Sequence, residues 1–493
     1  MNYMGISAGF HDAAVSVVNS SGDILFAAHS ERYSKKKHDK DICTELVLDA
    51  WAHVDSDQVE YHYYERPWAK AFRQLRSGEG FQWPTWDRLL GNTYNDLDRP
   101  RIHTHGHHLC HAAAGFQTSP YDDATVVVID AIGEFDTVTI WDAAYNDNTG
   151  CAEYKKLWSQ QYPHSLGLFY SAMTQRVGLR PLDEEYILMG MAAYGQPKYL
   201  REMQQQLVNS KDNSQFVQNL HIGVDDNFLP DADIMDIACS AQLLVEQLIR
   251  NIIGRARMIG RSRNLVYGGG VALNCVANSQ LGAFYKNIWI MPNPGDAGNS
   301  LGAAALGMGR HLKWDTAFLG HNIAGEYPVN SILDGLLTDR IVGVASGRAE
   351  FGPRALGNRS LLADPRGHSI KNKVNEIKRR QKFRPFAPVI LEEYVDQYFD
   401  MPKHWSNSRY MQVVATCRNP ELFPAIVHHD GTSRVQTVPA DGSGIRLLLE
   451  KWHFMTGCPM LLNTSLNIRG EPMVNDRADA DRFQRLYGIT VCS

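Results

Sequence analysis

The sequence lacks the features of a membrane or secreted protein. No apolar run approaches the roughly 18 residues that a membrane-spanning helix needs. The first residues do not have the basic and then apolar pattern of a secretory signal. The 8 cysteines form no CxxC pair and no regular spacing, so neither a disulfide framework nor a zinc ribbon is indicated. We therefore expect a cytoplasmic protein with reduced cysteines.

An excess of charge of one sign is also absent. The chain has 49 Lys and Arg against 54 Asp and Glu, which gives a formal net charge of -5. This balance provides no overall basic field for a polyanion, although a local basic patch would be hidden in the sum. Hydrophobic residues make up 44% of the 493 residues, and no segment is of low complexity. A chain of this length and composition is expected to form two or three globular domains.

A pattern of three strands occurs twice in the first half of the chain. In each set, alternating or apolar runs are separated by tight turns. The repetition predicts an α/β fold with an internal duplication and an active site between the two halves, whereas two unrelated sets of hairpins are the ordinary alternative. The two sets are residues 3–8, 13–19 and 24–29, and residues 124–130, 137–141 and 154–158.

Helical periodicity separates these strands and continues after them. Residues 43–53, 107–116 and 234–259 are predicted helices, and residues 271–281 are predicted to form another one. Motifs become sparse after residue 315, and a new strand begins at Ile341. We therefore predict two domains, residues 1–325 and 326–493, the second of which alternates strands with helices.

Histidines are concentrated between residues 103 and 111. On a helix, His107 and His111 are one turn apart, so both imidazoles project from one face and can bind one metal ion. Asp130 ends an apolar strand and Asp296 lies in a glycine-rich turn, so both carboxylates are candidate ligands. Such a mixed set suits Fe2+, Zn2+ or Mn2+. The ordinary alternatives are solvated histidines, a solvated strand end at Asp130 and a helix N-cap at Asp296.

A run of three glycines, Gly268, Gly269 and Gly270, follows a predicted strand and precedes a predicted helix. Glycines at this position let the backbone approach a phosphate closely. Asn274 lies just beyond them. The run alone is a weak sign of nucleotide binding. Its position in the chain between the other candidate metal ligands and Asp296 makes the prediction stronger.

Arginines recur in the last third of the chain, in segments rich in glycine and proline. Turns of this kind can fix several guanidinium groups toward phosphates, whereas a lone arginine is usually a surface ion pair. We therefore predict an anion site. Its candidate residues are Arg348, Arg354, Arg359, Arg366, Lys382, Arg384 and Arg434.

Residues 61–101 are rich in aromatic side chains with interspersed arginines. Such a segment can stack on bases or sugars, or it can form an ordinary packing surface. The aromatic residues are Tyr61, Tyr63, Tyr64, Trp68, Phe72, Phe81, Trp83, Trp86 and Tyr94.

Taken together, these segments resemble the NodU/CmcH carbamoyltransferase family, and the match covers nearly the whole chain. The ordered motifs make the resemblance specific. They are Gly9-Phe10-His11-Asp12-Ala13-Ala14, His107-His108-Leu109-Cys110-His111-Ala112, Met189-Gly190-Met191-Ala192-Ala193-Tyr194-Gly195, Gly269-Gly270-Val271-Ala272-Leu273-Asn274, Gly295-Asp296-Ala297-Gly298, the arginine segment ending at Asp364-Pro365-Arg366, Phe383-Arg384-Pro385-Phe386-Ala387-Pro388, Asp430-Gly431-Thr432-Ser433-Arg434-Val435-Gln436 and Leu462-Asn463-Thr464-Ser465.

The resemblance implies a fold and a reaction. It implies a duplicated, actin/sugar-kinase-like (TsaD-like) domain followed by a YrdC-like α/β domain. The YrdC-like domain would make carbamoyladenylate from carbamoyl phosphate and ATP, and the TsaD-like domain would transfer the carbamoyl group to an acceptor hydroxyl. The implied cofactors are ATP with Mg2+ and a divalent metal ion, with Fe2+ the first choice and Zn2+ or Mn2+ the others.

The resemblance also implies roles for individual residues. His11, beside Asp12, would be the base for the acceptor, provided that its pKa lies near neutrality. His107, His111, Asp130 and Asp296 would bind the metal. The residues Gly269, Gly270 and Asn274 would hold the adenylate, while Arg348, Arg354, Arg359, Lys382 and Arg384 would form the activation site. Two positions depart from the family pattern, where Ala131 replaces a more usual glycine and Ile187 a common lysine.

Two other readings stay open. Threonylcarbamoyl transfer to transfer RNA uses the same domain types, but the arginine segment and the acidic net charge argue against it. A non-catalytic nucleotide-binding protein could use the same fold, but the candidate ligands argue against it. The acceptor is expected to be a sugar or another small hydroxylated molecule, with a hydroxymethylated pyrimidine in a nucleotide or DNA as a minority alternative. A monomer and a homodimer both stay open.

Overall fold

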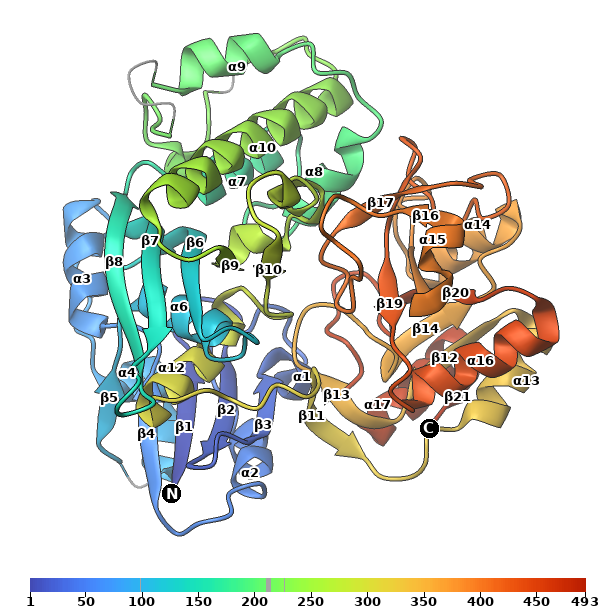
Figure 1. Cartoon of the computed structure of the whole chain (residues 1–493), viewed down its shortest axis with the longest axis horizontal. Helices are drawn as coiled ribbons and strands as arrows, with labels where there is room; N and C mark the ends of the chain where they lie inside the picture. Colours follow the sequence, from blue (N-terminus) through green and yellow to red (C-terminus); the bar gives the residue numbers. More distant parts are fainter. Residues whose placement is uncertain (98, 210–213, 226) are drawn as a thin grey trace. The chain divides into compact units, whose positions relative to one another are not determined.

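The computed structural model describes residues 1–97, 99–209, 214–225 and 227–493. The chain divides into two compact units (Figure 1). The N-terminal unit comprises Met1–Ser30 and His38–Asp315, and the C-terminal unit comprises Glu31–Lys37 and Thr316–Ser493. A short early segment of the chain therefore belongs to the later unit, which the sequence pattern did not predict.

The first sheet of the N-terminal unit has five strands in the order β3-β2-β1-β4-β5. The strands β1, β2 and β3 form an antiparallel meander, while β4 and β5 run parallel to β1. Burial of almost every residue of β1 and β2 makes this meander part of the core. The strands are β1 (Asn2–Ser7), β2 (Ala14–Asn19), β3 (Ile24–His29), β4 (Val59–Tyr63) and β5 (Ile102–Thr104).

The second sheet repeats this topology. Its order is β10-β9-β6-β7-β8, so that β6, β7 and β8 form the antiparallel meander and β9 and β10 run parallel to β6. The strands are β6 (Asp123–Gly133), β7 (Asp136–Tyr145), β8 (Ala152–Gln161), β9 (Asn264–Gly268) and β10 (Asn287–Trp289). Because order and directions agree strand by strand, the unit is an internal duplication, as the repeated strand pattern predicted.

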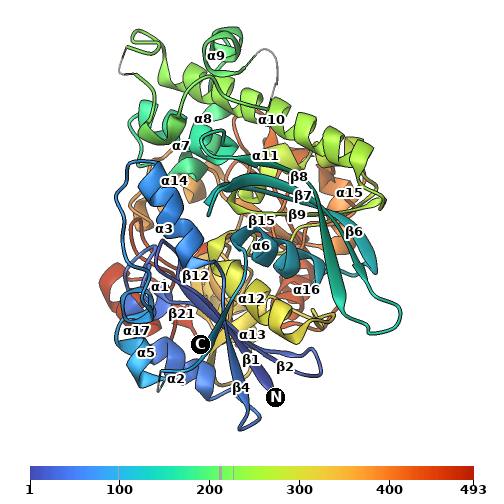
Figure 2. The ribbon, with the colours of Figure 1, turned by 90° about the vertical axis from the view of Figure 1, so that its left-hand side faces the viewer.

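Each repeat places a helix after its fifth strand. In the first repeat this is α6 (His107–Phe116), and in the second it is α12 (Asn299–Met308). The two helices pack against each other in the interior (Figure 2). Small residues make the contact possible, because a Cβ atom at Gly302 would lie only 2.0 Å from the Cys110 carbonyl oxygen. The close approach of α6 and α12 brings the start of both helices to the candidate site.

Further helices cover the sheets of the N-terminal unit. The long helix α10 is amphipathic, and Asp233 caps its first turn by accepting hydrogen bonds from the Met235 and Asp236 N–H groups. It packs against α7, α8 and α9. The helices are α2 (Thr44–Trp51), α3 (Pro67–Arg76), α4 (Trp86–Leu90), α5 (Asn92–Asp96), α7 (Leu166–Arg176), α8 (Glu185–Ala192), α9 (Leu200–Leu207) and α10 (Ile234–Ile259).

One predicted helix is wrong. Residues 271–281 do not form a continuous helix but three short pieces, η2 (Gly270–Leu273), α11 (Cys275–Asn278) and η3 (Leu281–Ala283). The break has a local cause, because the Asn274 side chain accepts a hydrogen bond from the Ala277 N–H and so starts a new helix.

The C-terminal unit is built on a six-stranded mixed sheet in the order β19-β15-β20-β14-β12-β21. One face packs against α13 and α16, around the buried Trp452. A separate two-stranded sheet pairs β11 with β13, and a three-stranded sheet joins β16, β17 and β18. The remaining helices include α14 (His368–Ile377) and α17 (Arg477–Tyr487). The strands and the other helices are β11 (Phe318–Ile323), α13 (Val329–Asp339), β12 (Ile341–Ala345), β13 (Gly347–Glu350), β14 (Arg359–Ala363), β15 (Ala387–Leu391), α15 (Val395–Tyr398), β16 (Phe399–Asp400), β17 (Val414–Cys417), β18 (Thr432–Arg434), β19 (Gln436–Val438), α16 (Gly444–Thr456), β20 (Met460–Ser465) and β21 (Val491–Cys492).

The division between the units falls between Asp315 and Thr316. The strand β11 pairs with β13, and this pairing attaches residues 318–323 to the C-terminal unit. In the described part of the chain, no helix combines the length and apolar character needed to cross a membrane. The eight cysteines are unbonded to one another.

Candidate functional site

The helix α6 presents two imidazoles at one point. Its alanine-rich sequence favours a helix, and the spacing of four residues puts His107 and His111 on the same face. Their Nε2 atoms are 3.1 Å apart, and both side chains are buried. His108, between them, points elsewhere and its Nδ1 atom bonds to the Thr139 hydroxyl at 2.9 Å. His108 is therefore a core residue and not part of this pair.

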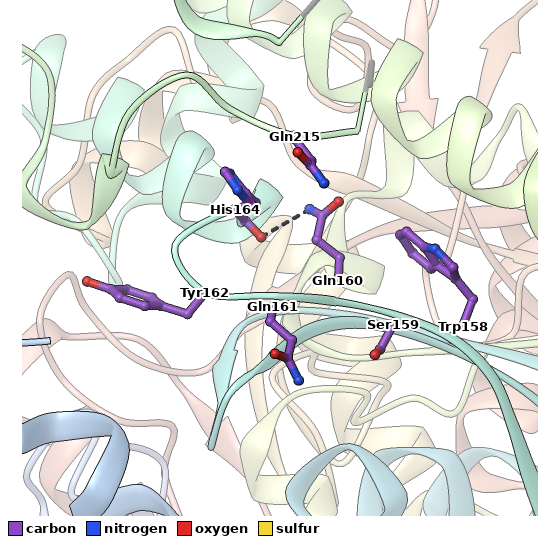
Figure 3. Close-up of a pocket in the computed structure, with 7 residues that line it drawn as sticks. All are labelled: Trp158, Ser159, Gln160, Gln161, Tyr162, His164 and Gln215. Carbon is purple, nitrogen blue, oxygen red and sulfur yellow. Dashed lines mark hydrogen bonds between the residues drawn. The ribbon is translucent and has the colours of Figure 1, made fainter. Parts of the chain in front are cut away.

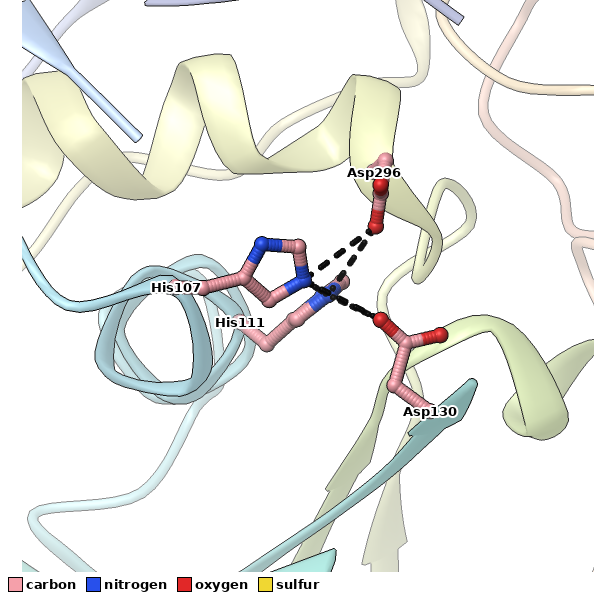
Figure 4. A group of neighbouring side chains, drawn as sticks. All are labelled: His107, His111, Asp130 and Asp296. Carbon is pink, nitrogen blue, oxygen red and sulfur yellow. Dashed lines mark hydrogen bonds and ion pairs between the residues drawn. The ribbon is translucent and has the colours of Figure 1, made fainter. Parts of the chain in front are cut away.

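Two carboxylates converge on the same imidazoles (Figure 4). Asp130, on β6, places its Oδ2 atom 3.1 Å from Nε2 of His107 and 3.3 Å from Nε2 of His111. Asp296, in η4 (Asp296–Gly298), places its Oδ1 atom 3.4 Å from each of these nitrogens. The four side chains come from three separate segments and are all buried.

The geometry of this group fits a metal ion. Each Nε2 atom has three partners at 3.1–3.4 Å, but an imidazole nitrogen carries at most one hydrogen, so hydrogen bonds cannot satisfy all of them. A single cation at the centre can. Ligand atoms about 2.1 Å from one ion are separated by about 3.0 Å at right angles and about 3.4 Å in a tetrahedron. The donor set of two nitrogens and two oxygens suits Fe2+, Zn2+ or Mn2+.

The internal duplication explains where the four side chains come from. In the first repeat, the β1–β2 turn carries His11 and the helix after the fifth strand carries His107 and His111. In the second repeat, Asp130 lies in the last part of β6, and the segment after the fifth strand carries Asp296. One repeat thus supplies the imidazoles and the other supplies the carboxylates.

His11 lies beside the four side chains. Its Nε2 atom is 3.9 Å from Asp296 Oδ2, and its Nδ1 atom hydrogen-bonds to Asp12 Oδ2 at 3.0 Å. Asp12 adopts a left-handed backbone conformation with φ of 53°, which a short polar residue tolerates better than most. This conformation belongs to the tight turn that aims both side chains at the site.

A further histidine, which the sequence pattern did not single out, continues this chain of contacts. The Nδ1 atom of His38 lies 2.7 Å from Asp12 Oδ1, and its Nε2 atom lies 2.9 Å from Asp183 Oδ1. Asp12 is therefore held between two imidazoles, which keep its pKa well below the usual value despite burial. His38 follows a run of three lysines, which is typical of an exposed segment. The sequence therefore did not predict that His38 contacts Asp12.

The carboxylates around His11 control its proton. Burial lowers the pKa of His11, but the hydrogen bond to Asp12 and the charge of Asp296 outweigh burial and raise the pKa to about 9. A compensating positive charge on the carboxylates would weaken this attraction. The pKa of His11 therefore lies above the near-neutral value that a general base requires, and loss of the Asp296 charge would lower it.

A small recess opens next to the four side chains. Its volume is about 10 Å3, close to that of one water-sized particle. His107 and Asp296 form part of its wall. The other lining residues are Phe10, Tyr64, Glu65, Lys70, Ile132 and Glu134.

The glycine run packs against the segments that carry Asp130 and His111 rather than against open space. Gly269 has a φ of 88°, and a Cβ atom there would lie 2.2 Å from the Ile129 carbonyl oxygen, so only glycine fits. The Gly270 N–H donates to Asp130 Oδ1 at 3.1 Å and so orients this carboxylate. A Cβ atom on Gly268 would contact the His111 carbonyl oxygen at 3.4 Å.

Asn274 is part of a buried amide network. Its side chain exchanges two hydrogen bonds with Gln242, whose Oε1 atom also accepts from the Tyr170 hydroxyl. Gln242 in turn donates to Glu246, and burial raises the pKa of this carboxyl. Tyr170, Gln242 and Glu246 were not identified from the sequence, because they lie on helices far from the glycine run.

In the C-terminal unit, Arg359 has a role different from the predicted one. Its guanidinium is fully buried and makes six hydrogen bonds to backbone oxygens, among them those of Ser346, His321 and Asn475. These bonds use its N–H donors and leave none directed at a phosphate. We therefore assign Arg359 to holding the surrounding loops together.

The other predicted anion-binding residues are more accessible. Arg348 and Arg354 are half-buried, and Arg348 donates to the Gly320 and Leu319 carbonyl oxygens. Lys382 is exposed and forms an ion pair with Glu376 at 3.4 Å. Arg384 and Arg434 are half-buried.

A buried lysine that the sequence pattern did not single out lies among these cations. The Nζ atom of Lys378 donates to the Oδ1 atom of Asn467 at 2.9 Å and to the hydroxyl of Ser465 at 3.2 Å. Burial, followed by the charges of Arg380 and Arg384, lowers the pKa of Lys378 well below its usual value. His428 is influenced in the same way, because burial and the charges of Arg434 and Lys371 lower its pKa to about 4. Basic groups that destabilise one another's charge favour a bound anion.

Replacing Arg359 by alanine is expected to destabilise the C-terminal unit by roughly 3 kcal/mol, because several buried backbone oxygens lose their hydrogen-bond donors. Lys382→Ala, at an exposed site, should change stability by less than about 0.5 kcal/mol. Urea unfolding followed by tryptophan fluorescence measures both. If the Arg359→Ala protein were as stable as wild type but no longer bound phosphate, Arg359 would be an anion-binding residue of the activation site after all.

The aromatic segment divides into a buried and an exposed part. Tyr61, Tyr63 and Tyr64 belong to the core. Trp68, Phe72, Phe81 and Trp83 are exposed and contact one another, with Phe81 and Trp83 at a centroid distance of 5.4 Å.

Comparison with known proteins gives a consistent result over both units. The family model for the carbamoyltransferase N-terminus matches residues 44–305, and the model for the carbamoyltransferase C-terminus matches residues 334–491. An uncharacterised protein of Synechocystis sp. is 33% identical over 97% of this chain and 93% of its own length. The nodulation protein NolO of Bradyrhizobium diazoefficiens is 32% identical over 76% of this chain and 75% of its own length. The nodulation protein NolNO of Sinorhizobium fredii is 28% identical over 95% of this chain and 76% of its own length.

Proposed function

Since the chain belongs to the carbamoyltransferase family, we propose that it is an ATP-using O-carbamoyltransferase with two separate sites. The C-terminal unit, as a YrdC-like domain, would make carbamoyladenylate from carbamoyl phosphate and ATP. The N-terminal unit, as an actin/sugar-kinase-like domain, would transfer the carbamoyl group to an acceptor hydroxyl.

The observation that carries the proposal is the convergence of His107, His111, Asp130 and Asp296 next to His11. These four side chains would hold a divalent ion, with Fe2+ the first choice and Zn2+ or Mn2+ the others. When bound, the ion would supply a positive charge that stabilises negative charge on the reacting group. The family models match the segments that contain all four residues.

The proposed transfer step uses His11 as the base. The acceptor hydroxyl gives its proton to Nε2 of His11 while its oxygen bonds to the carbamoyl carbon. The bond between this carbon and the adenylate oxygen then breaks, and AMP leaves. Asp12 bonds to the other ring nitrogen of His11, which favours the orientation and the protonated form of the ring.

The proposed activation step uses the cations of the C-terminal unit. Water hydrolyses carbamoyl phosphate to carbamate and inorganic phosphate. An oxygen of the carbamate then attacks the α-phosphate of ATP and displaces pyrophosphate. Both reactants are polyanions, and Mg2+ would accompany ATP. The clustered charges of Arg380, Arg384 and Arg434 support such a site, together with Arg348 and Arg354 on the preceding segments.

Incubation of the full chain with ATP, Mg2+, Fe2+, carbamoyl phosphate and a panel of hydroxylated acceptors tests the proposal. We expect pyrophosphate release and an acceptor that gains the mass of one carbamoyl group, without added threonine. A strict requirement for threonine and transfer RNA would instead favour threonylcarbamoyl transfer. Nucleotide binding without pyrophosphate release would favour a non-catalytic protein.

A further inference from the structure

A second pocket lies in the N-terminal unit, at the end of the edge strand β8 (Figure 3). Its volume is about 470 Å3, within the range of small-molecule sites. Residues 158–161 of β8 form one wall, and Tyr162, His164 and Gln215 complete the lining. None of these residues belongs to the metal-binding group or to its recess.

The lining of this pocket is polar. No Lys, Arg, Asp or Glu is among the described residues that line it. The Nδ1 atom of His164 accepts a hydrogen bond from the Phe216 N–H at 3.3 Å, which orients the ring. The charge nearest to Gln161 is compensated, because Asp136 pairs with Lys156 at 2.6 Å. A phosphate would find no Lys or Arg side chain in the lining itself, and the guanidinium of Arg255 lies over the ring of Trp158, so a neutral ligand matches the lining better than a nucleotide.

The pocket instead offers many neutral hydrogen-bonding groups. Gln160, Gln161 and Gln215 each contribute an amide with both donors and acceptors, and Figure 3 shows the Gln160 and Gln215 amides facing each other. Gln160 is 4% exposed and its Nε2 atom donates to the His164 carbonyl oxygen. Its Oε1 atom has no hydrogen-bond partner in the described part of the chain. A buried amide oxygen without a donor is costly, and a ligand hydroxyl would reach this one only after the Gln160 amide turns toward the pocket.

Aromatic rings and a sheet edge complete the site. Trp158 and Tyr162 provide flat apolar surfaces, and Arg255 covers one face of Trp158 at 4.5 Å. The hydroxyl of Tyr162 accepts a hydrogen bond from Asn219 at 2.7 Å, which fixes its ring. Among the described strands only β7 pairs with β8, so the outer edge of β8 adds backbone donors and acceptors.

We infer that this pocket binds a neutral carbohydrate. A sugar matches the lining in each respect, because adjacent hydroxyls pair with amides and apolar sugar faces pack on aromatic rings, while no charge has to be neutralised. The further role of the pocket, as the place that holds the glycan part of the acceptor, rests on the proposed function.

Direct contacts join the pocket to the metal-binding group. The His164 carbonyl oxygen accepts from the Thr137 hydroxyl, on the hairpin that follows Asp130. Ser165, the next residue, donates to the Ala131 and Asp130 carbonyl oxygens at 2.7 and 3.3 Å. The end of β8 is thus fastened to the same β6 segment that carries Asp130.

Calorimetric titration of the full chain with maltotriose, cellotriose and N-acetylated chitotriose tests the inference. We expect at least one of them to bind with a Kd of about 1 mM or below. The double substitution Gln161→Ala and Gln215→Ala should weaken this binding at least about tenfold, since it removes two amides from the pocket. Gln205→Ala, an exposed glutamine on α9, is the matched control and should leave binding unchanged.

Three results would overturn the inference. They are no trisaccharide binding up to about 10 mM, equal binding by the double variant, and tighter binding of AMP or of a neutral strand-forming octapeptide, which would add to the β8 edge. A transfer assay separates this inference from the proposed function. If the pocket holds the acceptor, the double variant raises KM for the glycan while pyrophosphate release without acceptor is unchanged. Sugar binding without any pyrophosphate release would overturn the proposed function alone.

Discussion

Replacing His111 by asparagine is expected to abolish metal binding in the N-terminal unit and to lower carbamoyl transfer about a thousandfold. His111 Nε2 contacts His107, Asp130 and Asp296, so its loss removes one of four converging ligands and leaves a buried gap. Stabilisation by a bound ion is worth several kcal/mol, and about 4 kcal/mol corresponds to this factor. Metal content by mass spectrometry and transfer by acceptor mass measure the two effects. Pyrophosphate release, which we assign to the C-terminal unit, should persist.

The matched control for this variant is His108→Asn. His108 lies on the same helix and is as buried as His111, but its ring bonds to Thr139 and faces away from the carboxylates. Its replacement should reduce stability without removing the metal. Equal metal loss in both variants would mean that α6 is merely disrupted. Full metal retention by His111→Asn would refute the ligand assignment.

Replacing His11 by alanine is expected to leave pyrophosphate release intact while carbamoyl transfer falls by a factor of about 10² to 10⁴, the range of general base catalysis. We expect this separation because the Nε2 atom of His11 lies 3.9 Å from Oδ2 of Asp296. His11 belongs to the N-terminal unit, whereas activation is proposed for the C-terminal unit. Metal content should stay near that of wild type. The two assays are run on the same protein sample, so that loss of folding cannot mimic loss of transfer.

His38→Asn tests whether the neighbouring contacts position His11. This variant removes a histidine that bonds to Asp12 but does not reach His11. We expect a smaller loss of transfer, about 10- to 100-fold, with a shift in the pH profile, because Asp12 loses a partner that stabilises its charge. His53→Ala, at a histidine that follows α2 and contacts the ring of Phe26, should have no effect. If His11→Ala abolished both partial reactions equally, the assignment of separate sites would be wrong.

Spacing along the sequence was sufficient to predict the local part of the site. The four-residue interval between His107 and His111 fixes their common face once a helix forms. The strand predicted to end at Asp130 continues to Gly133, but its last part still brings the Asp130 carboxylate to the two imidazoles. The duplication was visible because each half has three strand-like runs in succession, separated by turns. Their order in the sheets agrees with that pattern.

Contacts between distant segments could not be predicted in the same way. His38 bonds to Asp12 only because the chain turns back after β3. No helical or strand periodicity in the sequence predicts this turn. Arg359 looked like an anion ligand because arginines recur around it, yet burial forces its donors onto backbone oxygens. The break at Asn274 depends on one side-chain cap that overrides a helical pattern.

The early segment Glu31–Lys37 has a consequence for how the chain is assembled during synthesis. Arg32 is buried in the C-terminal unit, where it donates to the Gly352 carbonyl oxygen, and Lys35 forms an ion pair with Asp479. The ribosome makes these residues long before Gly352 and Asp479. The segment therefore lacks these partners until the last third of the protein has been synthesised. A fragment that ends at Asp315 would leave it permanently uncovered. Translation of the two units is sequential, but maturation of the C-terminal unit needs a piece of chain that was among the first to be made.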